Sequence, residues 1–86
     1  MEAEEMVGRA ARALAVHPEA LTIREISGKR VSIVELTVSP EDFKTFSNRR
    51  KKDAETLRDI TAAAAKKLNK ILVLEIVGQT QPKWAL

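Results

Sequence analysis

The sequence contains no cysteine and no tyrosine, and its only histidine is His17. Without cysteine the chain forms no disulfide and no thiolate metal site, which is typical of a protein from a reducing compartment. One histidine supplies too few ligands for a zinc site. No apolar run approaches the about 20 residues that a membrane-spanning helix needs, and the acidic start of the chain is unlike a secretory signal. We therefore expect a cytoplasmic protein without metal, cofactor or membrane partner.

The arrangements of side chains that enzymes need are missing as well. The sequence has only three glycines and no glycine-rich loop for a nucleotide phosphate. Nothing in the spacing of its serines, acids and single histidine indicates a catalytic triad or an acid–base pair. A chain of 86 residues also leaves little room for a substrate pocket. We expect that the protein is not an enzyme.

What remains is the composition of one folded domain. The chain is 44% hydrophobic and 31% charged, which is too apolar for a disordered protein. We expect one domain over residues 1–78 and a polar C-terminal tail over residues 79–86. The net charge of +3 is a mild bias, so the positions of the basic residues are more informative than their sum.

The first half of the chain predicts a helix and a hairpin. Apolar residues recur at helical spacing after a first turn rich in glutamate, and Pro18 ends the helix. The expected elements are a helix over residues 2–16, a strand over 20–26, a turn over 27–29 and a strand over 31–38. The second strand alternates, and its core-facing residues are Val34, Leu36 and Val38.

The second half predicts two helices and a last strand. Ser39 suits the N-cap of a short helix and Pro40 its first position. A longer helix over residues 51–68 buries the stripe Leu57, Ile60, Ala64 and Leu68 and ends at Asn69. A final strand covers residues 71–77. With few aromatic residues available, Phe43 and Phe46 are expected to pack in the core.

This order of elements predicts an α+β fold. A strand followed by two helices and another strand forms a right-handed crossover, which places the two strands parallel. We expect a three-stranded mixed sheet with all helices on one face.

Several segments, taken together, resemble the small stand-alone bacterial KH-domain proteins of the KhpA type. The resemblance covers about residues 6–77, and the segments that carry it are His17-Pro18-Glu19, Val38-Ser39-Pro40-Glu41-Asp42, Leu57-Arg58, Ala62 to Lys67 and Val73-Leu74-Glu75-Ile76. It implies a type II KH domain that binds single-stranded RNA. Such proteins pair with themselves and with a larger KH-containing protein, so the resemblance also implies a homodimer or heterodimer.

The resembled family carries a Val-Ile-Gly-x-x-Gly loop between the two middle helices, and this sequence departs from it. Without a gap, the two glycines of the family fall on Asn48 and Lys51, and the isoleucine falls on Ser47. The basic residue that follows is kept as Lys52. Glycine lets the backbone approach the phosphates closely, whereas asparagine still tolerates a left-handed turn. The sequence therefore exchanges a glycine cradle for cationic side chains.

Basic residues gather around this loop. Five lie within nine positions with no acid among them, and lysine and arginine provide most phosphate contacts. We expect the loop to hold a single-stranded RNA backbone with low sequence specificity. The candidate RNA-binding residues are Lys44, Asn48, Arg49, Arg50, Lys51 and Lys52.

Alternatives stand beside this interpretation. The basic run is also compatible with a solvated loop that has no partner. The loss of both glycines is compatible with a KH scaffold that binds only proteins. Arg58 either flanks the groove or pairs with acids of its own helix. His17 is expected either to be exposed or to interact favourably with the C-terminal end of the first helix. Trp84 is expected to hold the C-terminal tail against the domain.

Overall fold

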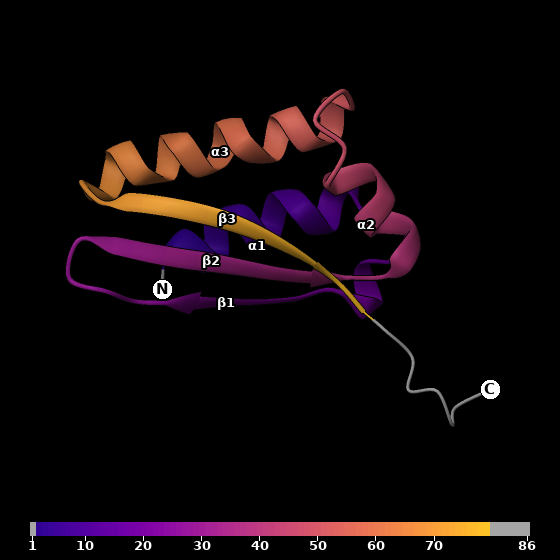
Figure 1. Cartoon of the computed structure of the whole chain (residues 1–86), viewed down its shortest axis with the longest axis horizontal. Coiled ribbons are helices and arrows are strands. Elements are labelled where there is room, and N and C mark those ends of the chain that lie inside the picture. Colours follow the sequence, from indigo (N-terminus) through magenta and orange to yellow (C-terminus); the bar gives the residue numbers. More distant parts are fainter. Residues whose placement is uncertain (1, 80–86) are drawn as a thin grey trace.

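The computed structural model describes residues 2–79, and Trp84 with the rest of residues 80–86 lies outside this part. Figure 1 shows helices packed against a β-sheet, and the sheet has three strands. The elements follow in the order α1 (Glu2–Leu14), a 3₁₀ turn η1 (Pro18–Ala20), β1 (Thr22–Ile26), β2 (Val31–Val38), α2 (Pro40–Phe46), α3 (Lys52–Leu68) and β3 (Ile71–Gly78). The predicted α+β order is confirmed.

The sheet has the order β1-β2-β3, with β2 in the centre. β1 pairs with β2 in antiparallel fashion, and β2 pairs with β3 in parallel. The parallel pair follows from the crossover through α2 and α3, because β3 must return along the side of β2 that β1 leaves free. The mixed sheet and its topology agree with the sequence prediction.

One face of the sheet carries the core. Along β2 the exposed fraction alternates, and the residues fully buried against the helices are Val34, Leu36 and Val38. α1 adds Val7 and Ala11, and α3 adds Leu57. Since side chains alternate across a strand, the alternating residues of β2 point to the opposite face of the sheet.

No described helix covers that opposite face. Its exposed aliphatic side chains include Ile26, Val31, Ile71 and Val73, with exposed fractions between 43% and 59%. Further along the same face, Glu35 of β2 lies directly across from Glu75 of β3 and forms an ion pair with Arg24 of β1 at 3.0 Å. The uncovered side of the sheet is thus apolar toward the β1–β2 turn and charged beyond it.

Four boundaries differ from the sequence prediction, and one of them is the start of α3, at Lys52 rather than at residue 51. α1 ends at Leu14 rather than at Val16, and β1 begins at Thr22 rather than at Ala20 because the 3₁₀ turn precedes it. β3 runs one residue longer than predicted, to Gly78.

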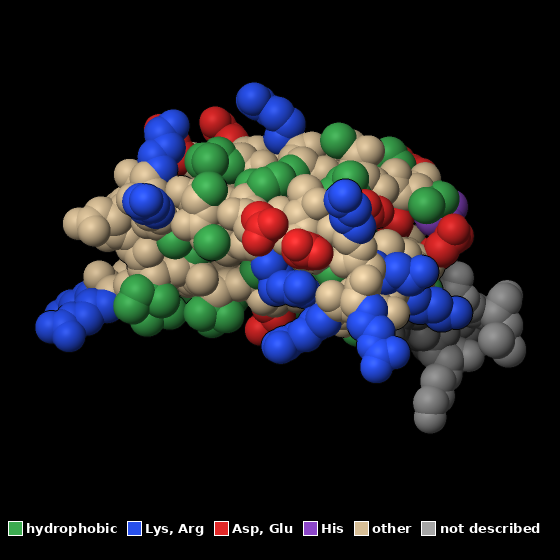
Figure 2. All heavy atoms as spheres, turned by 90° about the horizontal axis from the view of Figure 1, so that it is seen from above, with side chains coloured by type: hydrophobic (Ala, Val, Ile, Leu, Met, Phe, Trp, Pro, Cys, Tyr) green, Lys and Arg blue, Asp and Glu red, His purple; other side chains and the backbone are tan. Residues whose placement is uncertain are grey.

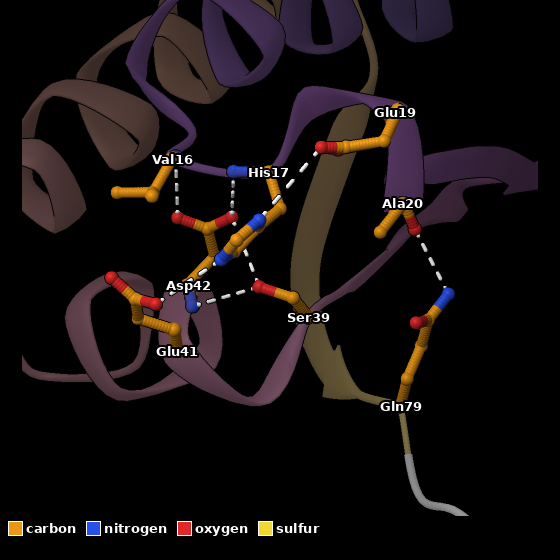
Figure 3. A network of polar contacts seen from close by, with 8 residues as sticks. All are labelled: Val16, His17, Glu19, Ala20, Ser39, Glu41, Asp42 and Gln79. Carbon is orange, nitrogen blue, oxygen red and sulfur yellow. Dashed lines mark hydrogen bonds and ion pairs between the residues drawn. The ribbon is translucent and has the colours of Figure 1, made fainter.

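The early end of α1 has a long-range cause, which Figure 3 shows. The carboxylate of Asp42, in the first turn of α2, accepts hydrogen bonds from the backbone N–H groups of Val16 at 2.8 Å and His17 at 3.0 Å. These donors lie after the helix and would otherwise lack partners in a partly buried place. The Ser39 hydroxyl donates to the same carboxylate at 3.1 Å. Asp42 therefore fixes α2 against the chain that leaves α1.

Candidate functional site

α2 is a helix of only seven residues, so its position depends on its ends and its packing. Ser39 caps it as predicted, because the backbone N–H of Asp42 donates to the Ser39 hydroxyl. Phe46, at the last position, is 3% exposed and packs in the core. Phe43 is 37% exposed, so the prediction of a core residue is wrong there, and its ring lies against Gly78 instead. α2 is held at both ends and presents the following loop in a fixed direction.

The hydrogen bonds around Asp42 and His17 also shift the pKa values of these two side chains. Burial of the Asp42 carboxylate raises its pKa, but the bonds from Val16, His17 and Ser39 outweigh burial, and the pKa lies below its ordinary value of 3.8. The His17 imidazole bonds Glu41 at 3.1 Å, and this contact holds its pKa above the ordinary value of 6.5. His17 thus does not cap the end of α1 with its side chain but pairs with α2.

The loop between α2 and α3 turns without any left-handed residue. Among the described non-glycine residues only Asn69, which ends α3 as predicted, has a positive φ. Asn48 shapes the loop in another way, because its side-chain oxygen accepts from the N–H of Arg50 at 3.0 Å and its carbonyl from the N–H of Lys51 at 2.9 Å. The idea that Asn48 preserves a left-handed turn is wrong, since a side-chain hydrogen bond closes the turn instead.

A small groove opens beside this loop. It has a volume of about 140 Å³, and its lining comes from α2, the loop, α3 and β3: Phe46, Ser47, Arg49, Ala54, Arg58, Leu74 and Ile76. Its floor is apolar, and two arginines and a hydroxyl stand at its rim. The Arg58 guanidinium reaches the carbonyl of Arg49 at 3.5 Å. Arg58 therefore flanks the groove, which decides between the two roles left open for it.

The basic side chains around the groove are free of acidic partners. Within residues 2–79 no ion pair involves Lys44, the loop cations or Arg58. Lys44 and every residue from Ser47 to Lys52 are exposed. Figure 2 shows many Lys and Arg side chains gathered at this end of the molecule, around the α2–α3 loop. Cations that are exposed and unpaired remain available for an anionic ligand.

The candidate residues from the sequence have different positions. Arg49 lines the groove and Asn48 shapes the turn. Lys51 is the N-cap of α3 and Lys52 its first residue, and neither of them lines the groove. Arg50 stands in the loop and Lys44 on α2, also outside the lining.

The sequence favours apolar groove residues from the adjacent sheet edge but does not identify the residues that form this floor. Ala54, Leu74 and Ile76 follow the helical and strand periodicities that indicate core residues. In the folded protein these three residues nevertheless line the groove, where α3 lies next to β3. A periodic pattern shows which face a residue takes but not whether its neighbour covers it completely.

Other types of site are not apparent among residues 2–79. No group of three or more His, Asp or Glu side chains is placed to hold a metal ion in this range. Within the same range, no helix combines the length and apolar character that crossing a bilayer requires.

Comparison with known proteins gives one consistent group of relatives. The RNA-binding protein KhpA of Caldanaerobacter subterraneus subsp. tengcongensis is 36% identical over 73 residues, which are 85% of this chain and 97% of the relative. The RNA-binding protein KhpA of Clostridium perfringens is 36% identical over 74 residues, or 86% and 99% of the two chains. That of Clostridium acetobutylicum is 34% identical over 67 residues, or 78% and 89%. No protein-family model and no solved structure matches the sequence.

Proposed function

Because this chain belongs to the KhpA family, we propose that it binds single-stranded RNA through the groove and the basic loop between α2 and α3. In this proposal the protein binds RNA without catalysing a reaction, and it does so in the cytoplasm. The observation that carries the proposal is the set of exposed, unpaired cations beside an apolar groove.

The chemistry of the groove suits an RNA strand. Phosphates would contact the exposed loop residues Arg49 to Lys52 and the side chain of Lys44. A base would lie on the apolar floor from Leu74 and Ile76, since single-stranded RNA offers its unstacked bases to protein surfaces. The site contains no exposed aromatic stack and few side-chain donors aimed at base edges, which favours low sequence specificity.

The test is a titration with a short oligouridine at several salt concentrations. Each phosphate neutralised contributes about −0.7 to the slope of log affinity against log salt for a single strand. Binding by the loop predicts a steep slope for the wild type. Arg49→Glu with Arg50→Glu should weaken binding and make the slope shallower.

The matched control carries Arg9→Glu with Arg12→Glu. These residues are exposed on α1 and give the same change of net charge away from the groove. A control that loses as much affinity as the loop variant would show that overall charge, and not the loop, binds the RNA. An affinity that does not change with salt would remove the phosphate contacts altogether.

A second function has a separate observation in its favour. The uncovered face of the sheet exposes Ile26, Val31, Ile71 and Val73, and patches of this kind mark protein interfaces. Beyond the patch stand Glu75 and the ion pair of Glu35 with Arg24, and at its other end the turn carries basic residues. Two copies stacked with their strands antiparallel would place Glu75 of one copy near the basic turn of the other. The competing proposal is therefore a scaffold that forms a homodimer through this face.

Sedimentation of the wild type separates the two proposals. A dimer that Ile71→Glu with Val73→Glu dissociates, and that Ala62→Glu with Ala63→Glu leaves intact, would support pairing through the sheet. Ala62 and Ala63 are suitable controls because they are exposed on α3 and lie outside the sheet. A monomer at all concentrations contradicts the homodimer, and association only with another KH-containing protein would replace it by a heterodimer.

A further inference from the structure

A second basic site lies at the end of α3 that is remote from the loop. It is an open pocket of about 490 Å³ between the β1–β2 turn, the last turn of α3 and the start of β3. Its lining consists of Lys29, Arg30, Ala65, Lys66, Asn69, Lys70 and Ile71. Four of these seven residues are cationic and none is acidic.

The backbone brings these cations together. Asn69 takes the left-handed conformation that ends α3 and turns the chain sharply into β3. The N–H of Ile71 then donates to the carbonyl of Arg30 at 3.3 Å, which fixes the β1–β2 turn against the end of the helix. The four cations therefore stand around one hollow, although they come from two separate segments of the chain.

Most of the positive charge in this pocket is unpaired. Within residues 2–79 the only ion pair of its lining joins Lys70 to Glu25 at 3.8 Å. Glu2 and Glu5 of α1 lie on the other flank of α3, where they line a different pocket together with Lys67, and the Glu4 carboxylate accepts a hydrogen bond from the backbone N–H of Glu25. Lys29, Arg30 and Lys66 thus face solvent without a neutralising partner.

The pocket and the loop groove both lie between α3 and β3. α3 contributes Ala54 and Arg58 to the groove and Ala65 and Lys66 to the pocket. Arg58 and Lys66 are eight residues apart, which corresponds to about 12 Å along the helix axis. Figure 2, which looks onto α3, shows Lys and Arg side chains gathered around the α2–α3 loop and others at the opposite end of the molecule, with both acidic and basic side chains between them. The surface therefore offers cations to phosphates at both of its ends.

We propose that this pocket is a second phosphate-binding site, which holds the continuation of the same RNA strand that occupies the loop groove. The inference rests on the proposed RNA binding and adds to it the length of RNA that the protein prefers. A KH loop clamps about four nucleotides. The two sites are about 12 Å apart along α3, which corresponds to about four stacked nucleotides at about 3.4 Å each, so a strand of twelve nucleotides is long enough to occupy both sites and to extend beyond them. An aliphatic and cationic pocket without aromatic residues suits phosphates better than bases.

The test compares oligouridines of four and twelve nucleotides. The twelve-nucleotide strand should bind with a steeper salt dependence than the short one. In Arg30→Glu with Lys66→Glu, the slope for the long strand should become shallower by about 1.4, for two lost phosphate contacts. Between 50 and 200 mM salt the wild type then loses about sevenfold more affinity than the variant. Binding of the four-nucleotide strand should stay within about twofold of the wild type.

The matched control is Arg9→Glu with Lys67→Glu, which makes the same charge change on the α1 flank of α3. A second variant, Arg30→Gln with Lys66→Gln, removes the two cations without introducing acids, so a folding defect from charge reversal does not hide the result. Equal losses in the pocket variant and the control overturn the second site. A long strand that binds no more steeply than the short one overturns it as well.

The outcome also separates this inference from the proposed function. If the loop variant loses the short strand but the pocket variants keep the long one, RNA binding stands and the second site falls. If the wild type binds neither strand, both fall together. Sedimentation of the pocket variants must match the wild type, so that altered self-association does not explain a lost affinity.

Discussion

At the scale of the residue, Asp42 joins two elements that lie far apart in the sequence. It is 2% exposed and its carboxylate accepts from two backbone N–H groups and one hydroxyl. The sequence indicates only an acid in the first turn of a helix. The two backbone N–H groups that it binds lie 25 and 26 residues away along the chain, so no local pattern could have identified them.

Asp42→Ala should lower the free energy of unfolding by about 3 kcal/mol, because buried donors near the end of α1 lose a charged acceptor. Urea unfolding measures the change. The control Asp59→Ala removes an exposed acid of α3 and should change stability by no more than about 0.5 kcal/mol. Equal midpoints for the two variants would mean that the Asp42 network contributes nothing.

The His17 side chain gives a pH-dependent signal at the same place. Its pKa is raised, mainly by the hydrogen bond to Glu41, so its contribution to stability is fully present below pH 6.5 and is lost as pH rises through the folded pKa. Asp42 has the opposite sign, because its lowered pKa gives stability above pH 3.8 that is lost as pH falls through the folded value.

An NMR titration of the single histidine should therefore show a midpoint above 6.5. Glu41→Gln should bring the midpoint back toward that value, while Glu35→Gln, on the other face of the sheet, should leave it in place. A midpoint that ignores Glu41 would contradict the contact between the imidazole and α2.

At the scale of the element, local chemistry explains what the sequence predicts well. Ser39 caps α2 with its hydroxyl, Asn69 ends α3 in the left-handed conformation, and β2 alternates as a half-buried strand should. Each of these features depends on neighbours within four residues. The predicted α1 is two residues too long because its end depends on α2. The left-handed turn expected at Asn48 is absent because the Asn48 side chain closes the turn with a hydrogen bond instead.

Substitutions in the α2–α3 loop test how Asn48 forms the turn and what Lys51 contributes. Asn48→Gly with Lys51→Gly should reduce the affinity for a short oligouridine, because the turn loses its side-chain bond and the site loses one cation. The salt slope should fall by about 0.7. Lys51→Gln is the control that removes the charge and keeps the backbone. An affinity that rises in the double glycine variant would mean that close approach of the backbone matters more than the charge.

The β1–β2 turn requires glycine for a steric reason. A Cβ on Gly28 would collide with the carbonyl oxygen of Val31, which belongs to the backbone and cannot move aside. Gly28→Ala should destabilise the protein by about 2 kcal/mol in urea unfolding. Gly8→Ala, in α1, meets mainly flexible side-chain atoms and gains helix propensity, so its stability should stay within about 1 kcal/mol of the wild type. Equal effects of both substitutions would contradict the steric account.

At the scale of the whole molecule, the central position of β2 sets the order of local stability. β2 is paired on both sides and supplies three fully buried apolar side chains, whereas the α2–α3 loop is exposed throughout. Amides of Val34 and Leu36 should exchange with solvent only through global unfolding, and amides of Arg49 and Arg50 should exchange orders of magnitude faster. Hydrogen exchange followed by NMR measures both. Similar protection in β2 and the loop would mean that the sheet is not the stable centre of the fold.

The hydrogen bonds between Asp42 and the end of α1 link a helix that contributes nothing to the groove with the short helix that opens it. Any change that shortens, extends or loosens the segment around Val16 and His17 moves the starting point of α2. The entrance of the groove moves with it, since Phe46, Ser47 and Arg49 all follow from α2. The shape of the groove is therefore open to adjustment from the N-terminal helix, at positions outside its lining.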